Sequence, residues 1–72
     1  QISDAGAAAI AEAIKASASL SHVFLQFNQI TSRGARALAA AIPFSNTIML
    51  VDLNGNPGVT SADKSAIEAA LA

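Results

Sequence analysis

Apolar and polar positions follow a pattern that recurs along the chain. Residues 20–30 read LSHVFLQFNQI, and residues 48–59 read IMLVDLNGNPGV. In each stretch apolar residues alternate with other residues and an asparagine follows, Asn28 in the first and Asn56 in the second. Alternation of this kind, rich in Val, Leu and Phe, is typical of short strands with one buried face. We therefore predict strands at about 22–26 and 50–54.

The segments around these strands have helical spacing. Ile10 and Ile14 lie four residues apart, and Leu38 and Ile42 repeat that pair. We predict helices at about 4–16, 32–42 and 61–71. The apolar positions of the helices and of the strand segments are expected to point inward and form the core: Ile10, Ile14, Leu20, Val23, Leu25, Ile30, Leu38, Ile42, Ile48, Val51, Leu53, Val59, Ile67 and Leu71.

Local signals mark the ends of the helices. Ser3 or Asp4 is expected to cap the first helix by accepting hydrogen bonds from free backbone N–H groups. Pro43 is expected to end the second, because proline lacks an N–H donor. Thr60 and Asp63 resemble a capping box at the start of the third.

A single offset of 28 residues relates the copies. It pairs Ile2 with Ile30, Gly6 with Gly34, Ile10 with Leu38, Ile14 with Ile42, and Leu20 with Ile48. The last copy has one extra residue in its turn, so Val59 lies 29 residues after Ile30. Many matches at one offset indicate a repeat architecture, here one segment of about two and a half repeats.

The pattern LxxLxLxxNxI, followed by a Gly-Ala-x-x-Leu-Ala helix, resembles leucine-rich repeats of the ribonuclease-inhibitor type. Ribonuclease inhibitor, the activator of the Ran GTPase, intracellular immune sensors and tropomodulin share this unit. The resemblance implies an α/β fold, a right-handed solenoid with parallel strands on its concave side and helices on its convex side. It also implies a cytoplasmic setting, with a cytoskeletal or ciliary assembly as one version.

Composition narrows the function classes. The formal net charge is −1 and 12% of residues are charged. The four basic residues are scattered, which argues against a nucleic-acid surface. The chain has no cysteine, so it has no disulfide or thiolate metal site, and charged residues interrupt its alanine-rich start, which argues against a membrane segment.

The outward strand positions are the candidate binding surface. Period-2 alternation places them opposite the core residues, with His22 beside Leu50, Phe24 beside Asp52, and Gln26 beside Asn54. An exposed Phe and Leu in one patch favour contact with a protein, because aromatic anchors dominate binding hot spots. Ordinary apolar surface, or cover from another segment of the same protein, is an equal alternative.

Asn28 and Asn56 have a structural and a functional interpretation. We expect a ladder in which each side-chain amide satisfies backbone groups where a strand turns, including those of the next repeat. The alternative is a ligand contact. Phe27 and Phe44 are expected to plug the space under local loops, with binding as the alternative.

Catalysis is not expected. His22 is the only histidine, and Asp52 would add at most one further ligand, whereas catalytic zinc sites use three protein ligands. No nucleophile elbow accompanies it, and the turn NGNPG lacks the lysine of a phosphate loop. No cofactor is predicted.

One helix stripe changes character in the last copy. Ala7 and Ala11 in the first helix match Ala35 and Ala39 in the second, and small residues allow helices to stack closely. Lys64 and Glu68 replace them in the third helix, with spacing for a weak ion pair. Terminal repeats need a polar outer face. We therefore predict that this helix is the C-terminal cap of a longer array, with further repeats or a partner covering the N-terminal side.

These observations favour a non-catalytic protein-interaction or scaffold module, with protein partners and no nucleic acid or membrane. Two alternatives rest on the resemblance: a GTPase-activating regulator similar to the Ran activator, or the repeat domain of an intracellular immune sensor.

Overall fold

Helices and strands alternate along the chain in a computed structural model, which describes residues 2–71. The elements in order are α1 (Asp4–Ala16), β1 (His22–Phe24), α2 (Ser32–Ala41), a 3₁₀ turn η1 (Ile42–Phe44), β2 (Leu50–Asp52) and α3 (Ser61–Leu71).

The first and third helices have the predicted bounds, and the second is one residue shorter. Its last predicted residue, Ile42, begins the 3₁₀ turn η1. Pro43 lies in this turn, where its missing N–H is tolerated. Regular helix therefore stops just before the proline.

Both strands are three residues long, which corrects the predicted spans 22–26 and 50–54. Beyond Phe24 the chain bends into a turn, and the side-chain amide of Asn28 donates to the carbonyls of Leu25 and Gln26. Side-chain hydrogen bonds thus take over from the regular strand geometry at this point.

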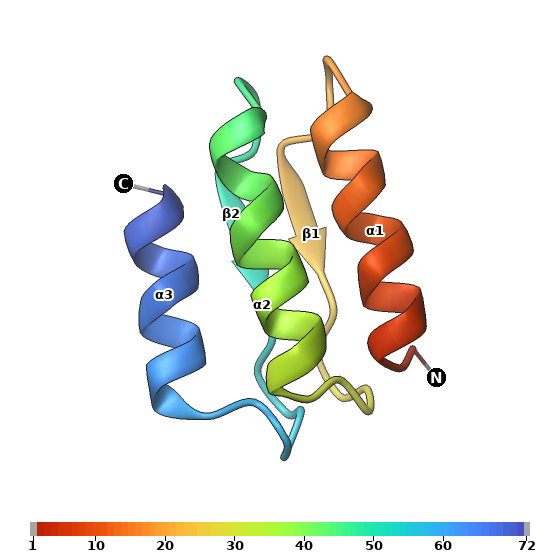
Figure 1. Cartoon of the computed structure of the whole chain (residues 1–72), viewed down its shortest axis with the longest axis vertical. Helices are drawn as coiled ribbons and strands as arrows, with labels where there is room; N and C mark the ends of the chain where they lie inside the picture. The colour runs from red at the N-terminus through yellow and green to blue at the C-terminus, as the bar shows by residue number, and fades with distance from the viewer. Residues whose placement is uncertain (1, 72) are drawn as a thin grey trace.

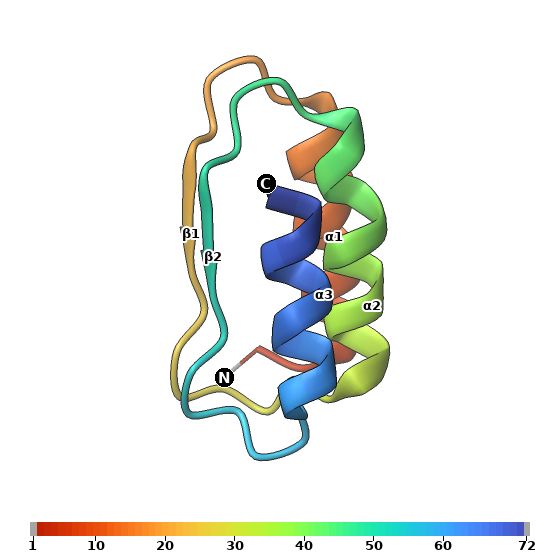
Figure 2. The same ribbon diagram turned by 90° about the vertical axis from the view of Figure 1, so that its left-hand side faces the viewer.

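The strands form a two-stranded parallel sheet in which β1 pairs with β2. Figure 2 shows the sheet as one layer and the three helices as the other. The helices stand side by side in the order α1, α2, α3, with α2 in the middle (Figure 1). The connection from β1 to β2 passes through α2 in the other layer, as a parallel pair of strands requires.

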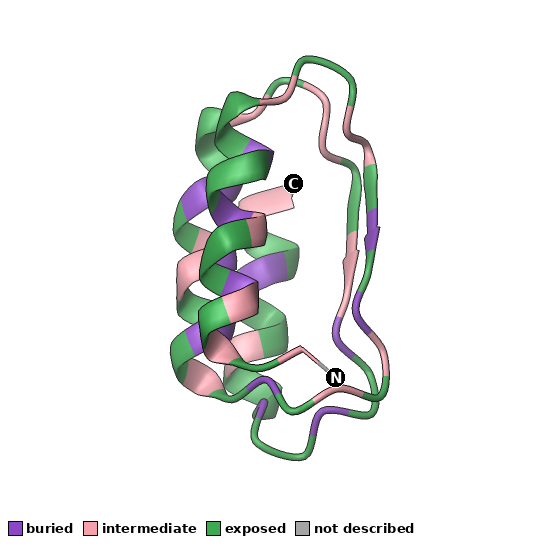
Figure 3. Ribbon diagram, turned by 90° about the vertical axis from the view of Figure 1, so that its right-hand side faces the viewer, coloured by how far each residue is buried: buried purple, intermediate pink, exposed green. Residues whose placement is uncertain are grey.

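The core lies between the two layers and is made of apolar residues from both. Its large fully buried side chains are Ile14, Ile30 and Leu38. Figure 3 shows buried positions in both layers, in the helices as well as in the strand layer and its loops. Leu25, Leu53, Val59 and Ile67 are buried as predicted.

Some predicted core residues are only half-buried. They are Ile10, Leu20, Ile48, Val51 and Leu71, all of which pack against the core from its margin. Ile10 belongs to the first helix of the stack, and Val51 and Leu71 belong to its last strand and helix. Outer elements have a neighbour on one side only, which leaves these side chains partly uncovered.

Gly34 lets α1 and α2 pack closely. A Cβ atom at this position would lie 2.6 Å from Asp4 Oδ1 and 3.0 Å from the Cβ of Ala7. Glycine is therefore required by the close approach of the two helices. None of the helices within residues 2–71 combines the length and apolarity needed to cross a lipid bilayer.

Candidate protein-binding surface

Six side chains project from the sheet on the side opposite the helices. The register pairs His22 with Leu50 and Phe24 with Asp52, as the alternation predicted. The pairing extends beyond the strands, where the N–H of Phe27 donates to the carbonyl of Asn54. We call this set the outer sheet face: His22, Phe24, Gln26, Leu50, Asp52 and Asn54.

One half of the outer sheet face is apolar and aromatic. Phe24 is 62% exposed and Leu50 is 38% exposed. The rings of His22 and Phe24 stack, with centroids 6.2 Å apart and an interplanar angle of 13°. The Ser21 hydroxyl and His22 Nδ1 share a hydrogen bond of 2.8 Å. The two rings thus form a flat, ordered platform in solvent.

The other half is polar and internally bonded. Gln26 Nε2 donates to Asp52 Oδ2 at 3.0 Å, and the N–H of Asn54 donates to Asp52 Oδ1 at 3.0 Å. Lys64 Nζ of α3 donates to Asn54 Oδ1 at 3.3 Å. Both carboxylate oxygens of Asp52 therefore have partners, which holds this side chain in one position.

The asparagines sit behind the face, where the strands turn. Asn56 is 3% exposed, and its Nδ2 donates to the carbonyls of Leu25 and Leu53 at 2.8 Å each. Its Oδ1 accepts from the N–H of Ile30 at 3.1 Å. Asn28 Oδ1 accepts in the same way from the N–H of Ile2. Each amide thus bonds to backbone of its own unit and of the preceding one.

A second set of contacts between units was not predicted from the sequence. Asp4 accepts hydrogen bonds from the N–H of Thr31 at 2.7 Å, the Thr31 hydroxyl at 2.6 Å and the N–H of Gly34 at 3.1 Å. It therefore caps α2, the neighbouring helix. Ser3, at the start of α1, makes no side-chain capping bond, so the expected cap of the first helix is wrong.

The hydrogen bonds from Thr31 hold the pKa of Asp4 below its usual value. The N–H of Gly34 and the nearby charge of Arg33 act in the same direction. A sequence signal for this contact does exist, since an acidic residue at the start of one helix lies one repeat before the start of the next. The sequence could not show that the two helix ends meet.

The predicted capping box of α3 is confirmed. The N–H of Thr60 donates to Asp63 Oδ2 at 3.0 Å, and the N–H of Asp63 donates to Thr60 Oγ1 at 3.2 Å. The Ser32 hydroxyl of α2 also donates to this carboxylate. The bonds from Ser32 and Thr60 lower the pKa of Asp63, with a smaller effect from the charge of Arg36.

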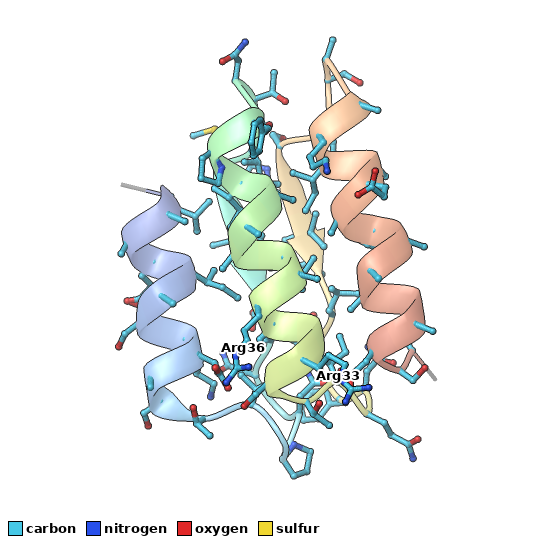
Figure 4. The ribbon with its side chains drawn as sticks, in the orientation of Figure 1. Arg33 and Arg36 are labelled. Atoms are coloured by element: carbon cyan, nitrogen blue, oxygen red, sulfur yellow. The ribbon has the colours of Figure 1, made fainter. Side chains whose placement is uncertain are left out.

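Figure 4 shows Arg33 on the side of α2 toward α1 and Arg36 on the side toward α3. Each arginine thus lies near the carboxylate whose pKa it helps to lower. The starts of all three helices lie at one end of the molecule (Figure 1). Acidic groups there interact favourably with the positive ends of the helix dipoles.

A family comparison covers one strand-helix unit. Residues 16–39 match a family model described as "Leucine Rich repeat". The match supports a leucine-rich repeat in this segment. It runs from the end of α1 through β1 into α2, and so contains the stretch that defines the 28-residue period. No curated protein and no solved structure matches the chain.

Phe27 and Phe44 do not fill the space under local loops, contrary to the prediction. Phe27 is 80% exposed and Phe44 is 73% exposed. Phe27 adopts a positive φ of 59°, like its counterpart Gly55 at 81°. Lys15 Nζ lies 5.8 Å from the ring centroid of Phe44.

Lys64 and Glu68 are exposed on the last helix. Their counterparts Ala7, Ala11 and Ala35 are buried between helices, so the two stripes differ in burial as well as charge. Lys64 bonds to Asn54 and forms no ion pair with Glu68, contrary to the spacing argument. Within residues 2–71, no cluster of three or more His, Cys, Asp or Glu side chains could hold a metal ion.

Proposed function

We propose that this chain is a non-catalytic protein-binding module and that its outer sheet face contacts the partner. Leucine-rich repeats generally mediate contacts between proteins, and residues 16–39 match a model of such a repeat. The 28-residue period with a helix in each unit favours the ribonuclease-inhibitor type. A scaffold role and a cytoplasmic setting rest on this resemblance.

The observation that carries the proposal is the exposed pair Phe24 and Leu50 on a regular sheet. Phe24 leaves most of its surface in water, and its stacked neighbour His22 enlarges the flat area. Ordered aromatic groups lose little conformational entropy when a partner covers them, and aromatic residues are enriched among binding hot spots. The pair is therefore suited to anchor a protein partner.

The polar half of the face would provide specificity. Asp52, Gln26 and Asn54 already have internal hydrogen bonds, so their positions are set before a partner arrives. A partner that offers donors to the free lone pairs of Asp52 would be selected over one that offers a carboxylate. Charge arrangement of this kind mainly sets specificity.

An affinity capture from lysate of the source cell, quantified by mass spectrometry, tests the proposal. The variant carries Phe24→Ala and Leu50→Ala. We expect this variant to capture at least about tenfold less of the specific partner than the parent does, because each anchor is a candidate hot spot. Its melting temperature should stay close to that of the parent, since both side chains are exposed.

The control carries Phe44→Ala and Met49→Ala, which remove apolar groups outside the outer sheet face that are even more exposed, at 73% and 69%. The control should retain the partner. Equal retention by both variants, or equal loss, would place the interface elsewhere.

A further inference from the structure

A hollow of about 240 Å³ lies between β2 and α3, beside the edge of β2 that does not pair with β1. Its apolar lining includes Val51, Leu53, Ile67 and Leu71, and Lys64 and Glu68 stand at its rim on α3. Figure 2 looks onto this side of the molecule, with β2 and α3 both facing the viewer.

The preceding unit shows what the hollow lacks. Val23 of β1 is 7% exposed because β2 lies beside it, whereas its counterpart Val51 is half-buried. Ile42 is likewise buried, whereas its counterpart Leu71 is half-buried. The uncovered apolar surface therefore matches the place that another strand would occupy.

The outer edge of β2 also has backbone groups that face away from β1, of which the Leu53 carbonyl already accepts one hydrogen bond from Asn56 Nδ2. The N–H groups of Leu25 and Phe27 donate to the carbonyls of Asp52 and Asn54, so these carbonyls point toward β1. Backbone groups alternate in direction along a strand, and those of Val51 and Leu53 consequently point away from β1. The described sheet has two strands, so this edge has no strand partner within residues 2–71.

The helix beside this edge, α3, favours binding of a single strand over docking of a further strand-helix unit. Ala7 of α1 and Ala35 of α2, equivalent positions one repeat apart, are fully buried in helices that have a further helix beside them. At the equivalent positions α3 carries Lys64 and Glu68, whose charges would lose water under a docked helix. A second copy that packed its own α1 against α3 would meet the same cost. An extended segment pairs with the edge and leaves these charges in solvent.

Charge narrows the chemistry of this segment. Lys64 is engaged with Asn54, whereas Glu68 forms no ion pair with any residue of 2–71. A lysine or arginine next to Glu68 would complete a pair at the rim, while an acidic residue there would be repelled.

We propose that the free edge of β2 binds an extended peptide of alternating apolar and basic residues, which adds a third strand to the sheet. Its backbone would bond to Val51 and Leu53, one apolar side chain would enter the hollow against Ile67 and Leu71, and a basic side chain would face Glu68. This surface adjoins the outer sheet face at Leu50, which also lines the hollow, whereas Phe24 lies outside it. Strand addition of this kind draws affinity from the main chain and specificity from alternate side-chain pockets.

The test is a titration of the purified protein with a short synthetic peptide of alternating valine and lysine, followed by amide NMR. We expect shifts and slower hydrogen exchange at the amides of Val51 and Leu53, with Phe24→Ala binding as tightly as the parent. No shift up to about 1 mM peptide, the weak limit of specific binding, would overturn the proposal. So would shifts confined to His22, Phe24 and Gln26, which lie outside the hollow. Dimerisation through β2 in the absence of peptide would also overturn it.

Two N-methylated versions of the peptide, here called its twins, test the backbone pairing. One carries N-methyl groups on one set of alternate amides, and the other carries them on the opposite set. In an added strand only one set of alternate amides faces the edge of β2. The twin methylated on that set should therefore lose binding, and the other twin should keep it. Equal behaviour of the twins would overturn strand addition.

The variant Glu68→Lys tests the charge preference. It should lower the affinity for the valine-lysine peptide by about two- to fivefold, because exposed ion pairs are weak. It should raise the affinity for a peptide in which glutamate replaces the lysines. The control is Glu12→Lys, the same charge change on exposed α1 surface away from the hollow, at a glutamate that pairs with Lys15. An equal effect of both variants would show that net charge alone acts, and would overturn the role of Glu68.

Discussion

At the scale of single residues, Asn56 links two units through one amide. It is buried, yet its three hydrogen bonds join the backbone of Leu25, Ile30 and Leu53. A buried side-chain amide without partners would be costly, and so would the backbone groups that it serves. Among the described residues, no buried side-chain polar atom lacks a hydrogen-bond partner.

Replacing Asn56 by Ala should lower the free energy of unfolding by about 1–3 kcal/mol, because Ile30 N–H and the carbonyls lose their partner. Urea denaturation followed by circular dichroism measures the change. The matched control is Asn46→Ala, an exposed asparagine, which should leave the midpoint in place. Similar midpoints for both variants would contradict the ladder.

At the scale of elements, the helices are joined by their first turns. Asp4 of α1 caps α2, and Asp63 of α3 accepts from Ser32 of α2. These bonds form between units and add to the apolar contacts of the core. The arrangement makes the positive end of α2 a meeting point of two carboxylates and ties all three helices together.

Acid should weaken this junction. The pKa of Asp4 and that of Asp63 are lowered in the folded protein, so the unfolded chain binds more protons as the pH falls below about 4. Their stabilising contribution is fully present above the unfolded value and is lost as pH falls through the folded value. Thermal unfolding at a series of pH values should show this decline.

The variant that carries Asp4→Asn and Asp63→Asn should show a shallower decline. Its curve should approach that of the parent at low pH, where the parent's two carboxyls are also neutral. Curves that stay parallel over the whole range would show that these two groups do not contribute.

At the scale of the whole molecule, the inner and outer edges of the stack differ. The middle elements are covered on both sides, whereas Val51 and Leu71 at one end are half-buried. Repeat proteins hold each unit mainly through its nearest neighbours. Local stability should therefore fall from the β1–β2 seam toward the outer edge of β2.

Native-state hydrogen exchange should report this gradient. The amides of Leu25 and Phe27 donate across the seam and should exchange at least about tenfold more slowly than those of Val51 and Leu53, which face the free edge. Both pairs belong to the same sheet, so each is the other's reference. Equal protection would mean that the edge of β2 is covered in solution.

Much of the fold followed from the sequence alone. The 28-residue offset located three helices and two strands, and alternation correctly placed His22 beside Leu50 and Phe24 beside Asp52. These features depend on side-chain direction, which has a fixed period in each element. The capping box of Thr60 and Asp63 is likewise local, which is why the sequence could predict it.

Tertiary structure decided the contacts between units. Asp4 bonds to Thr31 and Gly34 across a separation that only the folding of the chain closes. The exposure of Phe27 accompanies a backbone turn of positive φ, although its match to Gly55 was a signal for that geometry. Period and local capping are properties of the chain, whereas partners far apart in sequence, and the surface that remains uncovered, depend on how the units stack.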